Sequence, residues 1–456
     1  MLVSSLRGTF QDYYRSEDKY GHFEIAGGLS ADSGYFRFGE NAICYGRTAA
    51  GSLQMNEAGP MYDVLQNVTI RGSNAVLPFD PNEVVDNLRY ERYMNRGAGG
   101  PGQPAVSKSL AGKIYYMLRP FMPVSIRKHL QRRYLKGWDR IAFPSWPVDR
   151  TVENIFEQLM VLSLRSHKVG KIPFVWFWPE GYTGCAMMTH DIETEAGRDF
   201  CKELVEIDAS FGIKSSYQIV PEERYEVPET FLDFLRSSGC EVNLHGDNHD
   251  GTLFSNREDF LRRIKRINQY AKEYGAVGFR SPVLYRNLEW YDAMQFSYDM
   301  SVPASAHLEP QRGGCCTVMP YFVGDVVELP LTTTQDYSLW NILQDRSIEL
   351  WKKEIDLVLG KNGLVSFNTH PDYIMSDGCV DLYRQLLQHL TEVCAGRHAW
   401  LALPKEVDLW WRQRRQMELV SDGGQLRVRG PSSERAVVAY ASLDNGRVIY
   451  ELPDRQ

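Results

Sequence analysis

From residue 171 onward, short apolar runs alternate with longer stretches whose apolar residues recur every three or four positions. The short runs predict strands, and the longer stretches predict amphipathic helices. The predicted strands are 186–189, 215–220, 241–244, 277–279, 326–331, 364–368 and 400–403. The predicted helices are 199–211, 228–238, 257–274, 348–359 and 380–393. This alternation predicts a parallel sheet with crossover helices, and so many units in about 230 residues favour a closed β/α barrel.

The regions on either side of this pattern differ from it. Residues 20–90 contain short strand-like runs, with a hairpin signal around Gly39-Glu40-Asn41, and a Gly- and Pro-rich stretch at 95–112 is typical of a linker or loop. After the pattern, an aromatic helix at 407–417 precedes three strand-like runs at 425–429, 436–442 and 448–452. We therefore predict an N-terminal α+β extension over 1–170, a barrel over 171–408, and a C-terminal helix with a small β unit over 409–456.

Composition narrows the class of protein. The 456 residues are 43% hydrophobic and 24% charged, which excludes collagen-like, coiled-coil and wholly disordered chains. No stretch approaches the ~20 apolar residues of a membrane span, and residues 1–7 lack the apolar core of a secretory signal. The eight cysteines are dispersed without a CxxC pair, which favours buried thiols over a disulfide scaffold. These features predict a cytoplasmic protein.

The net charge of −7 conceals one strongly basic segment. Residues 113–140 contain eight Lys or Arg and one Asp, so the segment carries +7 and the remainder of the chain −14. One interpretation is a surface helix that contacts anionic lipids at the inner face of the membrane, with Trp138 at the interface. The alternative is a solvated or ion-paired helix that docks on an acidic neighbour. No RNA- or DNA-binding signature accompanies the segment, so no nucleic-acid partner is expected.

Polar residues directly after the predicted strands are the candidates for chemistry, because barrel active sites lie at the carboxyl ends of the strands. The first strand is followed by Asp191-Ile192-Glu193. Alternate residues of a strand share a face, so Asp191 and Glu193 are expected to point the same way. Two neighbouring carboxylates repel each other unless a cation joins them. This pair is therefore compatible with a metal site, although a solvated strand end has the same pattern.

The third strand is followed by two histidines, His245 and His249. Side chains four residues apart can share one face of a helical turn and converge on a metal. Two histidines and one carboxylate leave coordination positions open, which suits a catalytic rather than a structural metal. Glu193 or Asp191 is the candidate for the carboxylate ligand, and two unrelated surface histidines are the alternative.

Later strand ends add three further candidates. Arg280 follows the strand at 277–279, and an arginine there can pair with a carboxylate and keep it ionised. His370 follows the strand at 364–368, where it can act as a general acid near neutral pH. Asp299 is the candidate residue to orient His370. A lone arginine or histidine at a strand end is more often structural, so the set as a whole carries the prediction.

These motifs, in this order, resemble the NodB-homology polysaccharide deacetylases, a family of metal-dependent carbohydrate esterases (carbohydrate esterase family 4). The resemblance covers about 174–404. The first family motif, usually Thr-Phe-Asp-Asp, is matched by Thr189-His190-Asp191-Ile192-Glu193 in the manner of an Asp-x-Asp/Glu variant. The second, His-(Ser/Thr)-x-x-His, is matched by His245-Gly246-Asp247-Asn248-His249. The third, Arg-x-Pro, is matched by Arg280-Ser281-Pro282, and the fifth, a strand ending in His, by Thr369-His370. The fourth, an Asp-containing segment, is loosely matched by 298–302.

The resemblance implies a distorted β/α barrel and a role for each residue. Glu193, His245 and His249 would hold a divalent metal, with zinc first and cobalt, nickel or iron as alternatives. Asp191 would be the base, paired with Arg280, and His370 would be the acid, oriented by Asp299. The reaction would remove an N-acetyl group from a sugar or glycan precursor, as in bacterial surface-polysaccharide metabolism. The alternatives are a non-catalytic glycan-binding protein on the same barrel and a related amide hydrolase such as a deformylase.

Overall fold

The computed structural model describes residues 8–51, 53–54, 56–57, 59–94, 124–423 and 425–453, and side chains from 129 onward in helix α5. The chain divides into two compact units. The barrel unit contains 94–149 and 183–409, and the mixed unit contains 1–93, 150–182 and 410–456. This grouping differs from the predicted division into three consecutive segments. Residues 171–182 group with the first and last parts of the chain, and residues 124–149 group with the barrel. The predicted linker at 95–112 and the first part of the basic segment, 113–123, are outside the described residues.

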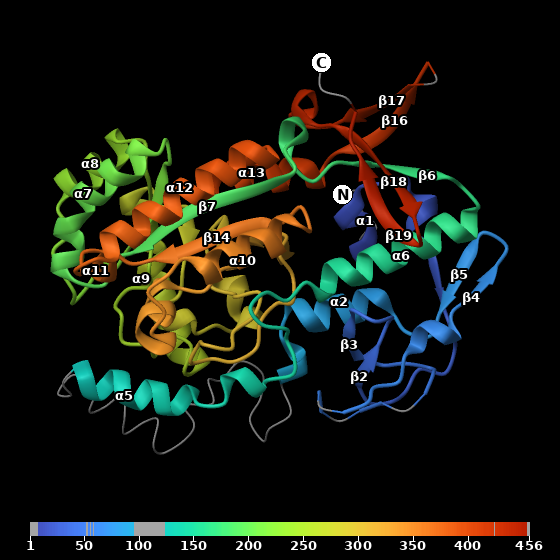
Figure 1. Cartoon of the computed structure of the whole chain (residues 1–456), viewed down its shortest axis with the longest axis horizontal. Helices are drawn as coiled ribbons and strands as arrows, with labels where there is room; N and C mark the ends of the chain where they lie inside the picture. The colour runs from blue at the N-terminus through green and yellow to red at the C-terminus, as the bar shows by residue number, and fades with distance from the viewer. Residues whose placement is uncertain are drawn as a thin grey trace. The chain divides into compact units, whose positions relative to one another are not determined.

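The barrel unit is built on a sheet of nine strands, in the order β12-β13-β11-β10-β9-β8-β7-β14, with β15 also paired to β7. Every pairing is parallel except that of β12 with β13. Strands β7 and β14 run side by side in Figure 1. The strands are β7 (Gly184–Asp191), β8 (Ser215–Ile219), β9 (Glu241–Leu244), β10 (Gly278–Phe279), β11 (Tyr298–Asp299), β12 (Tyr321–Val323), β13 (Val326–Glu328), β14 (Leu364–Thr369) and β15 (Ala399–Leu401).

The helices follow the strands as the apolar pattern predicts. Those after residue 190 are α7 (Glu195–Ser210), α8 (Glu229–Ser237), α9 (Arg257–Tyr274), α10 (Glu349–Leu359), α11 (Pro371–Ile374), α12 (Cys379–Arg397) and α13 (Pro404–Arg415). Helix α5 (Val124–Leu135) belongs to the same unit by its contacts. Among the described residues, no helix is both long and apolar enough to span a bilayer.

The sheet curls so that its two ends are joined by side chains. The hydroxyls of Thr332 and Thr333, which follow β13, donate to the carbonyl oxygens of Leu364 and Ser366 in β14, each at 2.8 Å. Because these links replace part of a regular ladder, the barrel is distorted. The predicted fold class, a distorted β/α barrel, is confirmed.

Strand β7 shows how the fold separates core from site. All eight of its residues are buried. Ala186 and Met188 belong to the apolar core between the sheet and the helices, and His190, on the same face, bonds Asp208 at 3.0 Å. Since successive side chains of a strand point to opposite faces, Thr189 and Asp191 point to the barrel interior. This alternation delivers Asp191 to the site.

The mixed unit combines four small sheets, β1-β5-β4, β2-β3, β19-β18-β6 and β16-β17. The predicted hairpin near residue 40 is formed by β2 and β3, and the predicted tail strands are β17, β18 and β19. Strand β6, at the start of the predicted barrel region, instead pairs antiparallel with β18. The elements are α1 (Thr9–Tyr14), β1 (Phe23–Ile25), β2 (Gly34–Arg37), β3 (Ile43–Gly46), β4 (Thr69–Arg71), β5 (Asn74–Leu77), α2 (Pro81–Arg89), α6 (Thr151–His167), β6 (Lys171–Val175), β16 (Glu418–Asp422), β17 (Gln425–Arg429), β18 (Val438–Asp444) and β19 (Arg447–Glu451).

Candidate metal and catalytic centre

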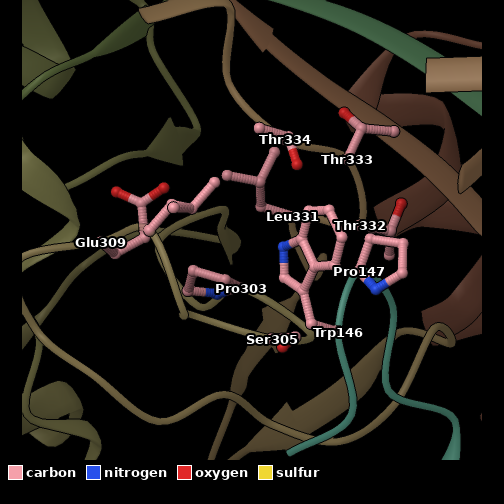
Figure 2. Close-up of a pocket in the computed structure, with 10 residues that line it drawn as sticks. Trp146, Pro147, Pro303, Ser305, Glu309, Leu331, Thr332, Thr333 and Thr334 are labelled. Atoms are coloured by element: carbon pink, nitrogen blue, oxygen red, sulfur yellow. The ribbon is translucent and has the colours of Figure 1, made fainter. Parts of the chain in front are cut away.

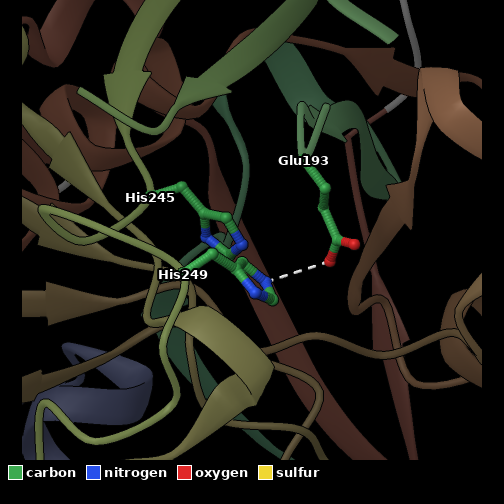
Figure 3. A group of neighbouring side chains, drawn as sticks. All are labelled: Glu193, His245 and His249. Atoms are coloured by element: carbon green, nitrogen blue, oxygen red, sulfur yellow. Dashed lines mark ion pairs between the residues drawn. The ribbon is translucent and has the colours of Figure 1, made fainter. Parts of the chain in front are cut away.

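Glu193, His245 and His249 converge at the carboxyl ends of β7 and β9 (Figure 3). One donor atom from each lies within 4.8 Å of the other two. Glu193 Oε1 is 3.0 Å from His249 Nε2, and the two histidine rings are 5.1 Å apart. A carboxylate with two imidazoles is a donor set that zinc and similar divalent metals accept. The structure therefore brings the three predicted metal ligands together.

The histidines present suitable nitrogens to this point. His245 Nδ1 lies 3.1 Å from the carbonyl oxygen of Arg280, and a carbonyl can only accept, so Nδ1 carries the proton and Nε2 keeps its lone pair. Burial lowers the pKa of His245 to about 4, so the ring is neutral at pH 7. His249 Nε2 is buried and faces Glu193 Oε1 at 3.0 Å, the ion pair drawn in Figure 3, but no contact with hydrogen-bond geometry to this nitrogen occurs among the described residues. A buried nitrogen in this state fits a site that a metal completes.

The second motif has Gly246 directly after His245, where Ser or Thr is usual, and the local geometry gives a reason for glycine. Its φ of +74° lies in the left-handed region, and a Cβ there would be 2.7 Å from Pro282 Cγ. Pro282 belongs to the Arg-x-Pro motif, so the two motifs pack closely at this turn. A side chain at 246 would separate them.

Asp191 is held as an ionised carboxylate between two donors. Arg280 Nη1 donates to Oδ1 at 2.9 Å, and Asn368 Nδ2 donates to Oδ2 at 3.0 Å. Burial opposes the charge, but Arg280 and then His245 and His370 lower the pKa of Asp191. His245 Nε2 is 3.7 Å from Oδ2, which places this carboxylate beside the metal ligands. A charged carboxylate in this position can accept a proton from a water molecule.

His370 is oriented by Asp336. Its Nδ1 lies 2.6 Å from Asp336 Oδ1, and its backbone N–H donates to Oδ2 at 2.7 Å. Burial opposes protonation, but the Asp336 carboxylate, followed by Glu193 and Asp191, raises the pKa of His370 to about 10. His370 Nε2 is 3.9 Å from Glu193 Oε1, so it points into the same site. A protonated imidazole there can act as a general acid.

The prediction that Asp299 orients His370 is wrong. Asp299 instead accepts from Tyr291 Oη at 2.8 Å and from the Ser301 hydroxyl at 2.7 Å. It ends β11, which neighbours β10 and β13, whereas His370 follows β14 at the other end of the sheet. Asp336 reaches His370 because the chain after β13 crosses to β14 through Thr332 and Thr333.

Sequence reasoning also missed residues that hold the site. Asn368 stood at the end of a predicted strand, and Asp336 followed another predicted strand by five positions, so a search for every polar group after a strand finds both. Asp372 and Tyr373, in α11, contact the Glu193 turn, with Asp372 Oδ2 accepting from the Glu193 N–H at 3.0 Å. No periodicity marks Asp372, because its partner is 179 positions away.

The site opens into a cleft of about 520 Å³. Its walls include Glu193, His249 and His370, and the ring centroids of Tyr337 and Tyr373 lie 5.2 Å apart beside them. Helix α5 supplies a further part of the wall, where Gln131 accepts a hydrogen bond from the Tyr337 hydroxyl. A volume of this size falls in the usual range for small-molecule sites.

A second cavity, shown in Figure 2, is of a different kind. Its volume is about 20 Å³, which is room for one water molecule. Trp146 and Leu331 line it, together with Glu309, a residue that also borders the large cleft. Burial raises the pKa of Glu309. The large cleft, and not this cavity, has room for a substrate.

No protein-family model and no curated protein sequence matches the chain. Several solved structures are similar. One, from Mycobacterium smegmatis, is described as a polysaccharide deacetylase (20% identity, 52% of this chain and 93% of that chain, TM-score 0.42). A second is Puue allantoinase (11% identity, 52% and 92%, TM-score 0.39). A third is peptidoglycan deacetylase PdaC from Bacillus subtilis (13% identity, 52% and 95%, TM-score 0.34).

Proposed function

We propose that this chain is a metal-dependent amide hydrolase that removes N-acetyl groups from a sugar or glycan precursor. One observation carries the proposal. A Glu-His-His set, an ionised Asp191 and a His370 paired with Asp336 meet beside a cleft that is large enough for a small molecule and that Glu193, His249 and His370 line. Together these groups can supply a base, an acid and a metal site for the hydrolysis of an unactivated amide.

Glu193, His245 and His249 would hold the metal, with zinc as the first choice and cobalt, nickel or iron as alternatives. When bound, such an ion polarises an acyl carbonyl and lowers the pKa of a coordinated water. The carboxylate of Asp191 accepts a proton from water, and Arg280 keeps that carboxylate ionised between turnovers. His370 donates a proton to the departing amine, and Asp336 holds the ring through Nδ1 so that Nε2 faces the cleft. Water is consumed, and acetate and a free amino sugar are released.

The first test of this proposal is acetate release from a panel of N-acetylated sugars and oligosaccharides, with zinc added to the purified chain. The variants Asp191→Asn and His370→Ala should lose 10²–10⁴-fold in kcat and still bind zinc. The variants His245→Ala and His249→Ala should lose both zinc and activity. Full activity of Asp191→Asn and His370→Ala would contradict the roles assigned to these two residues.

The same panel separates the alternatives. A chain that binds oligosaccharides but releases no acetate with zinc, cobalt or nickel would be a glycan-binding protein on this barrel. Release of formate from N-formyl compounds without release of acetate would identify a deformylase. Neither result changes the assignment of the metal ligands, which metal analysis of the purified chain tests separately.

A further inference from the structure

The turn that carries Glu193 needs support from elsewhere in the fold. Strand β7 ends at Asp191, and α7 begins at Glu195, so Glu193 lies in a short connection without ladder hydrogen bonds of its own. Glutamate also has one more rotatable bond than aspartate and loses more conformational entropy when it is fixed. A metal ligand at this position therefore depends on contacts that hold the turn.

Asp372 makes those contacts with both of its carboxylate oxygens. Oδ2 accepts from the backbone N–H of Glu193 at 3.0 Å, and Oδ1 accepts from the Thr194 hydroxyl. Thr194 is in turn the N-cap of α7, because its Oγ1 accepts from the N–H of Gly197 at 3.2 Å. One side chain thus fixes the backbone of the ligand and the first turn of the helix that follows it.

Gly197 shows how closely Asp372 approaches. A Cβ at 197 would lie 2.5 Å from Asp372 Oδ2, a distance that real Cβ atoms essentially never show. Gly197 is in the first turn of α7, where alanine would favour the helix more than glycine does. The close approach of the carboxylate is a physical reason for glycine at this position.

Asp372 also links the proposed metal ligand Glu193 to the proposed acid His370. Helix α11 begins directly after His370, and the N–H of Ile374 donates to the His370 carbonyl at 3.0 Å. The neighbouring Tyr373 has its hydroxyl 3.4 Å from Glu193 Oε2. Among the described residues, Asp372 forms no ion pair with Lys or Arg. Its contacts are directed at the Glu193 turn.

We propose that Asp372 is a positioning residue that holds Glu193 in the geometry for metal binding. This rests on the proposed function, since it assumes that Glu193 is a metal ligand. In the Asp-x-Glu motif the metal ligand is a glutamate placed one residue later than the usual aspartate. Asp372 would hold the backbone of this glutamate so that its longer side chain reaches the metal. Partners that orient a metal ligand typically contribute 10–100-fold to metal affinity.

Zinc affinity, measured by competition with a chromophoric chelator, tests the proposal. Asp372→Ala removes both hydrogen bonds and should weaken zinc binding 10–100-fold. Asp372→Asn can accept from the Glu193 N–H and donate to Thr194 Oγ1, so its affinity should stay within about threefold of wild type. Gly197→Ala should also weaken zinc binding, because the new methyl group displaces the Asp372 carboxylate.

Thermal unfolding of the metal-free chains separates positioning from stability. Gly197→Ala loses the hydrogen bonds of Asp372 to the Glu193 turn but gains the higher helix propensity of alanine, so its unfolding temperature should fall no further than that of the control variant. Asn256→Ala, which removes the side-chain cap of α9 (Asn256 Oδ1 to the Asp259 N–H, 2.8 Å), is the matched control. It should lower the unfolding temperature, because the helix loses its side-chain cap, and leave zinc affinity unchanged.

The outcomes are distinct. Wild-type zinc affinity in both Asp372→Ala and Gly197→Ala overturns the role of Asp372 while the metal site stands. If Asp372→Ala does not fold, Gly197→Ala decides alone. A wild-type chain that binds no zinc, cobalt, nickel or iron overturns the proposed function and this inference with it.

Discussion

Replacing Asp336 by asparagine isolates the partner that the structure assigns to His370. The substituted side chain would keep the shape of the aspartate and an oxygen acceptor near His370 Nδ1, which is 2.6 Å from Asp336 Oδ1. The negative charge is lost, and the amide nitrogen that takes the place of Oδ2 can no longer accept from the His370 backbone N–H, a loss that the control variant below also has to match. The substitution therefore tests whether that charge keeps His370 protonated.

The expected magnitude follows from the pKa of His370. Asp336 is the largest influence that raises this pKa to about 10, against an ordinary value of 6.5, while burial acts in the opposite direction. Without the charge the pKa should fall to 6.5 or below, a change of more than three units, or roughly 4–5 kcal/mol between the two protonation states. Wild-type His370 is protonated at pH 8, whereas in the variant it would be almost entirely neutral.

Two measurements follow this change. NMR titration of the His370 ring in the metal-free chain should show the midpoint fall from about 10 to 6.5 or lower. In the zinc-loaded enzyme, kcat at pH 8 should fall 10²–10⁴-fold, which is the usual contribution of a general acid. In the pH profile of kcat, the decline at alkaline pH should begin at a lower pH than in wild type.

Asp299→Asn is the matched control, because Asp299 is also buried and hydrogen-bonded in the same sheet but bonds Tyr291 and Ser301. It should lower the unfolding temperature without moving the titration of His370. An unchanged pH profile in Asp336→Asn, or an equal shift in Asp299→Asn, would refute the assignment of Asp336.

Three further predictions concern stability and binding. Burial raises the pKa of Glu354 to about 8 from 4.5, so the folded chain retains a proton that the unfolded chain releases between these pH values, and stability falls as pH rises through this window. Glu354→Gln can keep both bonds to Thr334, so its free energy of unfolding in denaturant titrations should exceed that of wild type by about 3–4 kcal/mol near pH 7–8 and equal it below pH 4.5. An equal pH dependence in the two chains would contradict this. Zinc at 100 times its Kd should add about 2.7 kcal/mol to the free energy of unfolding, and this increment should be absent in His249→Ala, whereas an equal gain in both chains would place the ion elsewhere. Reversing the basic charges of 113–140 should reduce sedimentation with anionic liposomes if that segment contacts membranes, and unchanged sedimentation would reject the contact.

Much of the barrel could be predicted from local patterns. The strand 241–244 and the helix 257–274 were predicted with the bounds that β9 and α9 have, since an apolar run between clear breaks marks both ends. The two-residue strand β10 lies within the predicted strand 277–279, whereas β11, of the same length, has no strand signal of its own and was not predicted. Strand β6 was placed in the barrel by its position in the sequence, but it pairs with β18, more than 260 residues later.

For the candidate site, the sequence by itself predicted that six residues share one edge of the sheet, because parallel strands bring their carboxyl ends together and each of these residues ends or follows a strand: Asp191, Glu193, His245, His249, Arg280 and His370. It did not determine which acid serves His370. Asp299 and Asp336 both follow strand-like runs, and the choice depends on how the chain after β13 crosses to β14, a closure made by Thr332 and Thr333. The contact of Asp372 with the Glu193 turn depends on another long-range contact, the parallel pairing of β14 with β7. Local periodicity indicates which face of a strand a residue occupies. The contacts of His370 with Asp336 and of Glu193 with Asp372 join residues 34 and 179 positions apart, so they form only when the sheet assembles.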